Sequence, residues 1–149
     1  MATKKGIWNL QQVRDKQLQS LWDYSGANYL FTWGQNNFGQ GGQNNRTAYS
    51  SPVQVPGTWS ALGHYSGNDS GAFTGGVKTD GTLWSWGYNK QGQLGQNSQT
   101  YYSSPVQIPG TTWANLFIGG PNVAFATRTD GTLWAVSYTH LTLPTILLV

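Results

Sequence analysis

The chain has 149 residues, of which 38% are hydrophobic, 14% aromatic and only 9% charged, against about 25% charged in an ordinary globular chain. Eight tryptophans exclude a disordered chain, and the absence of cysteine excludes disulfides and thiolate metal sites. The net charge of +3 is concentrated in the first 16 residues, and the rest of the sequence lacks the basic stripe typical of nucleic-acid binding.

Residues 1–27 are predicted to form a helical lead-in. The segment from Asn9 to Trp22 places apolar residues on one face at helical spacing, and Asn9 with Gln12 suits a capping box; the apolar residues are Leu10, Val13, Leu18 and Leu21. Two interpretations stay open: the helix packs on the first repeat or a partner, or it docks the repeats to a larger assembly. No apolar run of signal-peptide length follows the N-terminal lysines, so no export signal is predicted and the localisation stays unassigned.

Residues 28–135 contain an internal duplication. The segments 30–57 and 83–110 share most of their pattern, and an offset of 53 residues separates Trp33 from Trp86. A fixed period near 50 residues predicts a repeat array, in which each unit buries its apolar face against its neighbours.

Alternating patterns predict a hairpin inside each repeat. Apolar or small residues alternate with others over 73–77, and Asp80-Gly81 follows as a two-residue turn with positive φ at both positions. Asp130-Gly131 repeats this turn. The returning strand is expected to place Trp84 and Trp86 on one face, because side chains two apart in a strand point the same way.

Prolines and tryptophans predict where the remaining strands lie. Trp59 and Trp113 are expected to open the strand that follows each proline segment. The PVQVP and PVQIP segments suit an edge strand, where the missing N–H groups do no harm; their prolines are Pro52, Pro56, Pro105 and Pro109. About four short strands per period, packed around an axis, predict an all-β fold of the β-propeller type.

The string TDGTLWSWGYNKQGQLG resembles the repeat of the regulator of chromosome condensation family. The resemblance falls in the second unit on Asp80, Gly81, Trp84, Trp86, Gly87, Asn89, Gly92, Gln93, Leu94, Gly95, Pro105 and Val106. In the first unit it falls on Trp33, Gly34, Asn36, Gly39, Gln40, Gly42, Pro52 and Val53. That unit departs from the pattern at Gly41, where Leu is expected, and at Ala27-Asn28, where the Asp-Gly turn is expected.

This resemblance implies a partial propeller, with about two repeats of a seven-bladed parent, used mainly as a binding surface. The name-giving member of the family is a guanine nucleotide exchange factor on chromatin, so an exchange factor-like regulator of a small GTPase is the alternative function. The Gly/Asn/Gln-rich repeats and the short lead-in are also similar to proteins of marine tailed phages, which implies a virion or tail-associated role. Scaffold residues by themselves transfer no function.

The third repeat unit stops after Ala135. The pattern requires Trp-Gly next, and the chain has Val136-Ser137. Residues from Val136 to Val149 begin VSYTHLTLPT, which resembles a translated sequencing adapter, so residues 136–149 are expected to be a non-native tail on a metagenomic fragment; a genuine divergent end is the alternative. The final apolar stretch is too short to span a bilayer, and no membrane association is predicted.

The sequence offers little material for catalysis. It has no Glu, and Asp80 and Asp130 hold equivalent turn positions, where aspartate is a turn former. His64 and Asp69 with Ser66 or Ser70 make a poor hydrolase triad, because no nucleophile elbow surrounds either serine. We expect a non-catalytic protein with no cofactor and no metal.

Binding has better support from two loops, 43–52 and 96–105. They contain Arg46, Tyr49, Tyr101 and Tyr102, and tyrosine and arginine dominate the energetics of many recognition surfaces. The expected partner is a protein or a saccharide of unknown identity. The alternative is that these residues are only polar turn formers.

Overall fold

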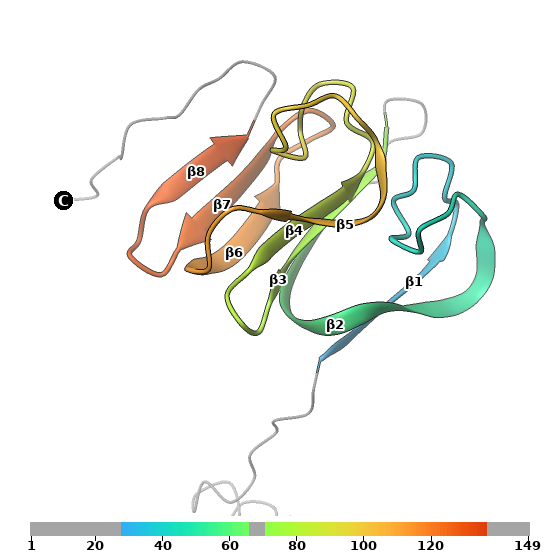
Figure 1. Cartoon of the computed structure of the whole chain (residues 1–149), viewed down its shortest axis with the longest axis horizontal. Helices are drawn as coiled ribbons and strands as arrows, with labels where there is room; N and C mark the ends of the chain where they lie inside the picture. The colour runs from blue at the N-terminus through green and yellow to red at the C-terminus, as the bar shows by residue number, and fades with distance from the viewer. Residues whose placement is uncertain (1–27, 66–70, 137–149) are drawn as a thin grey trace, which may run out of the picture.

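The computed structural model describes residues 28–65 and 71–136, and the regular secondary structure in those two ranges is β-strand throughout (Figure 1). The helix expected between Asn9 and Trp22 lies outside the described residues. The strands are β1 (Tyr29–Gly34), β2 (Tyr49–Tyr65), β3 (Phe73–Lys78), β4 (Leu83–Gly87), β5 (Tyr102–Ile108), β6 (Trp113–Ile118), β7 (Ala124–Arg128) and β8 (Leu133–Val136). The all-β prediction is confirmed for these residues.

The long strand β2 belongs to two neighbouring blades of the sheet structure. It pairs with β1 up to Thr58 and with β3 from Trp59 onward, always antiparallel, and Figure 1 shows the strand bending between its two partners. Trp59 therefore opens a new pairing rather than a new strand. The second half of β2 with β3, β4 and β5 makes one complete four-stranded blade, which we call the central blade.

Two incomplete blades flank the central one. The first blade contains β1 and the first half of β2, and the third blade contains β6, β7 and β8 as a separate sheet. The expected edge position of the prolines is confirmed at β5, which is the last strand of its sheet. The first half of β2 is also an edge within the described residues, because it pairs with β1 on one side only.

The predicted two-residue hairpin turns are wrong in type. The Gly81 N–H donates to the Lys78 carbonyl at 2.9 Å, the Lys78 N–H donates to the Thr82 carbonyl at 2.8 Å, and only Gly81 within the loop has positive φ, at 78°. This is a three-residue loop, a β-turn followed by a left-handed glycine. Residues 128–132 repeat it, with Gly131 at φ 83°.

The aspartate of each turn fixes the tryptophan after it. Asp80 Oδ1 accepts from the N–H and the hydroxyl of Thr82, and Trp84 Nε1 donates to that hydroxyl at 2.7 Å. The ammonium of Lys78 lies 3.9 Å from the Trp84 ring centroid and 5.3 Å from that of Trp59, a cation–π arrangement. The third blade repeats both features with Asp130, Thr132, Trp134, Arg128 and Trp113.

One buried asparagine closes each glycine-rich loop. Asn36 donates to the carbonyls of Asn45 and Thr47 at 3.0 and 3.1 Å and accepts from the Gly41 N–H at 2.7 Å. In the second unit Asn89 forms the same three bonds with Ser98, Thr100 and Leu94. The loops therefore have a defined shape without regular secondary structure.

Trp86 joins the first blade to the central blade. It is fully buried beside Leu30, Val55 and Trp59, and its Nε1 donates to the Gln40 carbonyl at 2.8 Å. The equivalent Trp33 on β1 is 65% exposed, because the described residues place no blade against that side of β1.

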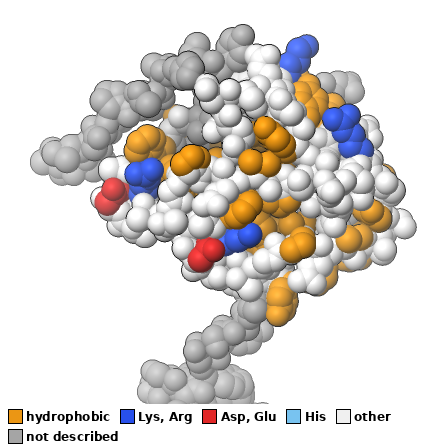
Figure 2. All heavy atoms as spheres, viewed as in Figure 1, with side chains coloured by type: hydrophobic (Ala, Val, Ile, Leu, Met, Phe, Trp, Pro, Cys, Tyr) orange, Lys and Arg blue, Asp and Glu red, His pale blue; other side chains and the backbone are white. Residues whose placement is uncertain are grey.

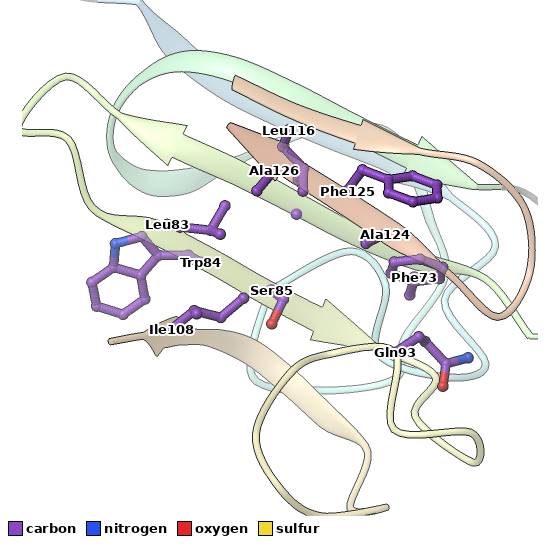
Figure 3. Close-up of a pocket in the computed structure, with 11 residues that line it drawn as sticks. Phe73, Leu83, Trp84, Ser85, Gln93, Ile108, Leu116, Ala124, Phe125 and Ala126 are labelled. Atoms are coloured by element: carbon purple, nitrogen blue, oxygen red, sulfur yellow. The ribbon is translucent and has the colours of Figure 1, made fainter. Parts of the chain in front are cut away.

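The seam between the central and third blades is closed. The side chains of Leu116 and Ile118 on β6 press against the glycines Gly63 and Gly75, where an added Cβ would stand less than 3 Å from one of them. Figure 3 shows this seam with side chains from both blades, and the cavity left there is about 20 Å³, close to the smallest space that holds one water.

The position expected for a third Trp-Gly pair lies at the end of β8. The backbone of Val136 pairs with Ala124 and so continues the strand. Residues 137–149 lie outside the described residues, and the boundaries 1–27, 28–135 and 136–149 stay predictions.

We predict that Asn36→Ala destabilises the protein by about 2–3 kcal/mol, because it removes three hydrogen bonds made by a buried side chain. The adjacent Asn37 is exposed, so Asn37→Ala is expected to change the free energy of unfolding by less than about 0.5 kcal/mol. Urea unfolding followed by tryptophan fluorescence measures both values. Equal effects of the two substitutions would contradict the role of the Asn36 bonds.

We predict that the turn aspartates Asp80 and Asp130 contribute to folding stability in a way that depends on pH. The hydrogen bonds from Thr82 hold the pKa of Asp80 below its ordinary value, and those from Thr132 do the same for Asp130. Because the folded-state pKa is lowered, the stabilisation is present above the ordinary carboxyl pKa of about 3.9 and is lost as the pH falls through the folded-state value. The double variant Asp80→Asn, Asp130→Asn should therefore lose less stability than the parent between pH 5 and acid pH in urea titrations. Parallel losses in both proteins would refute this prediction.

Candidate functional site

The loop between β1 and β2 lies against the start of β5. The Asn44 N–H donates to the Ser103 carbonyl at 2.7 Å, and Gly39 approaches so closely that an added Cβ would stand 2.5 Å from Ser103 Cα. This contact brings the first predicted binding loop, 43–52, next to the end of the second, 96–105.

Three aromatic rings from different segments meet at this junction. The Phe38 and Tyr88 centroids lie 5.1 Å apart, those of Tyr88 and Tyr101 lie 4.9 Å apart, and those of Phe38 and Tyr101 lie 6.2 Å apart. The ring planes are tilted or edge-on, which is the favoured geometry for aromatic pairs. All three side chains are half-buried, so the cluster keeps an accessible side.

Arg46 stands near this aromatic cluster. Burial raises the pKa of Tyr101 and its interaction with Tyr88 raises it further, while the Arg46 charge acts in the opposite direction. Arg46 is exposed. An exposed guanidinium beside half-buried tyrosines can offer charge, hydrogen bonds and stacking to a partner. We call Phe38, Arg46, Tyr88 and Tyr101 the aromatic junction.

The structure places the other two predicted residues elsewhere. The Tyr49 hydroxyl accepts from Asn45 Nδ2 at 2.9 Å, within its own loop. Tyr102 pairs with Gly87 in the sheet and packs against two clusters of the hydrophobic core. Of the four predicted binding residues, the aromatic junction contains only Arg46 and Tyr101, and a binding role for all four stays a prediction.

Phe38 and Tyr88 were missed by the sequence reasoning, although a signal was present. Both stand where the two repeat units differ, since Gln91 matches Phe38 and Gln35 matches Tyr88. Arg46 and Tyr101 also lack counterparts, with Gln99 and Ala48 at the matching positions. Residues that maintain the scaffold repeat in both units, whereas the aromatic junction consists of residues that do not.

A second candidate site is an open pocket of about 370 Å³ beside β1. Its walls include Phe31, Trp33, Leu62 and His64. The Thr74 hydroxyl donates to the Gln40 carbonyl at 3.0 Å and therefore accepts from His64 Nδ1, which lies 2.9 Å away. Burial lowers the pKa of His64.

The charged groups of the described residues are few. Their acidic side chains are Asp80 and Asp130. Figure 2 shows a face on which few side chains are charged. Among the residues that the structure describes, no three His, Cys, Asp or Glu side chains gather as metal ligands, and no helix long and apolar enough for a membrane span occurs. Ser66, Asp69 and Ser70 lie outside the described residues.

Comparison with known proteins supports the fold. The family model described as the regulator of chromosome condensation (RCC1) repeat matches residues 80–116, which include the turn at Asp80, the glycine-rich loop and the start of β6. No curated protein matches the chain. The family match thus covers part of one 53-residue period.

Two solved structures are similar to the chain in fold. The crystal structure of human WBSCR16 has a TM-score of 0.63 at 18% identity, and the alignment covers 73% of this chain and 28% of that one. The crystal structure of Prp20p from Saccharomyces cerevisiae has a TM-score of 0.60 at 15% identity, covering 75% of this chain and 30% of that one. The chain spans less than a third of either structure, and over that span it has the fold of RCC1-like propellers.

Proposed function

We propose that this protein is a non-catalytic interaction scaffold and that the aromatic junction binds a protein partner. The observation that carries the proposal is the convergence of non-repeated side chains on one accessible spot of a repeated framework. The ring centroids of Phe38, Tyr88 and Tyr101 lie within about 6 Å of one another, and the charge of Arg46 acts on Tyr101. Tyrosine and arginine on a rigid support are the residues that most often dominate binding energy.

The similarity to Prp20p supports a protein partner, because Prp20p binds Gsp1p and histones. The charges of this chain favour a partner other than histones. Its described residues carry Arg46, Lys78, Lys90 and Arg128 against two aspartates, and this excess of positive charge repels a basic partner.

A saccharide is the second ligand class that the aromatic junction suits, since aromatic faces and nearby amides recognise sugars. The resemblance to phage proteins adds the finer proposal that the surface serves a virion or tail. Docking of residues 1–27 to a larger assembly belongs to the same proposal.

The exchange-factor alternative predicts a different measurement. Release of a fluorescent guanine nucleotide from Gsp1p is expected to stay at its intrinsic rate when the chain is added, because the aromatic junction contains no carboxylate that could compete for the Mg²⁺ of the nucleotide. An acceleration that depends on chain concentration would favour the exchange-factor function over the scaffold.

We predict that binders selected against the chain from a peptide-display library use the aromatic junction. Arg46→Ala and Tyr101→Ala should each weaken such binders about tenfold or more, as expected for central arginine and tyrosine contacts. Gln99→Ala, which alters the exposed position matching Arg46 in the second unit, is the control and should leave affinity unchanged. Titration calorimetry measures the affinities.

The same variants applied to an immobilised glycan panel test the saccharide class. Binders or glycans that tolerate both Arg46→Ala and Tyr101→Ala would contradict the assignment of the aromatic junction.

A further inference from the structure

Tyr88 and Tyr101 stand opposite each other just beyond the end of a strand pair. The strands β4 and β5 are antiparallel, and their last register partners are Gly87 and Tyr102. Continuing this register by one residue sets Tyr88, which follows Gly87, opposite Tyr101, which precedes Tyr102. Side chains opposed across an antiparallel pair start from Cβ atoms about 5 Å apart and can contact each other.

The two tyrosine rings meet through their hydroxyl-bearing edges. The ring centroids lie 4.9 Å apart, and the ring planes make an angle of 51°. Burial raises the pKa of Tyr101, and a side-chain hydrogen bond with Tyr88 raises it further, so the two phenol oxygens lie close together. The ring carbons next to these oxygens are therefore neighbours as well.

Surrounding residues hold the two rings in this arrangement. An added Cβ at Gly71 would overlap the Tyr88 ring, so the backbone of Gly71 packs directly on it. The Phe38 centroid lies 5.1 Å from that of Tyr88 and 6.2 Å from that of Tyr101. Both tyrosines are half-buried and so stay within reach of a small reagent. Two groups held in contact by a rigid framework react far faster than the same groups free in solution.

The tyrosine pair is an addition to the repeated framework. The register of the first unit continues from Gly34 and Tyr49 to Gln35 and Ala48, which match Tyr88 and Tyr101. Within residues 28–65 and 71–136, the other aromatic ring pairs each include a phenylalanine or a tryptophan. Folding of the repeat therefore does not require two tyrosines at this place.

We propose that Tyr88 and Tyr101 are a site of oxidative cross-linking, at which a one-electron oxidant joins the two side chains as dityrosine. Each phenol gives one electron to the oxidant and its hydroxyl proton to water, which leaves two phenoxyl radicals. The radicals form one carbon–carbon bond between the carbons next to their oxygens. Each of these carbons then releases its proton, and each oxygen takes one up, as the rings regain aromaticity. In total, two electrons pass to two equivalents of oxidant and two protons pass to water.

The cross-link would close the glycine-rich loop of the central blade. Tyr88 begins this loop directly after β4, and Tyr101 ends it directly before β5. A covalent bond between the two ends removes conformations from the unfolded chain and so stabilises the fold. The modification acts on the chain alone and does not depend on a binding partner.

The test is oxidation of the full chain with illuminated ruthenium tris-bipyridyl and persulfate, which is reduced to sulfate. We expect dityrosine fluorescence and a monomer that has lost two hydrogen atoms. Trypsin cleaves after Lys78, Lys90 and Arg128, so the two tyrosines fall in separate peptides, 79–90 and 91–128. Mass spectrometry should find these peptides joined, with the bond at Tyr101 rather than at the adjacent Tyr102.

Two conservative variants complete the test. Tyr88→Phe keeps the ring but should lose the joined peptide, whereas Tyr102→Phe is the matched control and should retain it, because Tyr102 packs against the hydrophobic core. Oxidation should also raise the urea midpoint of the unsubstituted chain and should not raise that of Tyr88→Phe. Absence of the joined peptide from the oxidised unsubstituted chain, coupling at Tyr102, or cross-links only between separate chains would overturn the proposal.

Discussion

The carbonyl of Gln40 is the point on which the two halves of the structure depend. It accepts from Trp86 Nε1 at 2.8 Å and from the Thr74 hydroxyl at 3.0 Å, so one oxygen of the first blade holds β3 and β4 of the central blade. Both bonds are buried, and burial makes their loss costly because neither group regains water. A Cβ at Gly42 would stand 2.8 Å from Trp86 Nε1, and φ there is 72°, so the joint also requires a glycine.

This joint explains why the repeat appears in the sequence with such clarity. The loop that supplies Gln40 must present its carbonyl outward, and Asn36 fixes the loop by three bonds to backbone groups. The Asn36 amide contacts backbone groups rather than side chains, so no compensating substitution elsewhere can replace it. Positions that face solvent on the same loops carry no such constraint, and there the two units differ. The aromatic junction occupies those free positions.

The strands and the four-stranded blade were accessible from the sequence because alternation and Asp-Gly turns report local backbone preference. The type of the Asp80 turn was not, since the same dipeptide serves two loop lengths and the Thr82 bonds decide between them. The continuity of β2 through Thr58 was also hidden, because Pro56-Gly57 just before it is typical of a boundary between two strands. The candidate site could be predicted only in part: Arg46 and Tyr101 are recognisable as residue types, but their meeting with Phe38 and Tyr88 depends on the packing of the first loop against Ser103.

The shared strand β2 also determines how the blades depend on one another. Because its first half completes one blade and its second half begins the next, separating the blades would break strand pairing as well as the contacts of Trp86. In a stacked repeat, the stability is approximately the sum of the stability of each unit and of the interfaces between neighbouring units. Here the interface between the first and central blades includes the strand β2, which runs from one blade into the other. The next seam, between the central and third blades, also requires particular residues. Gly63 and Gly75 must be small there, because a larger side chain would collide with Leu116 or Ile118. The packing between blades thus constrains the residues at each interface, whereas the surface loops can vary and so can determine binding specificity.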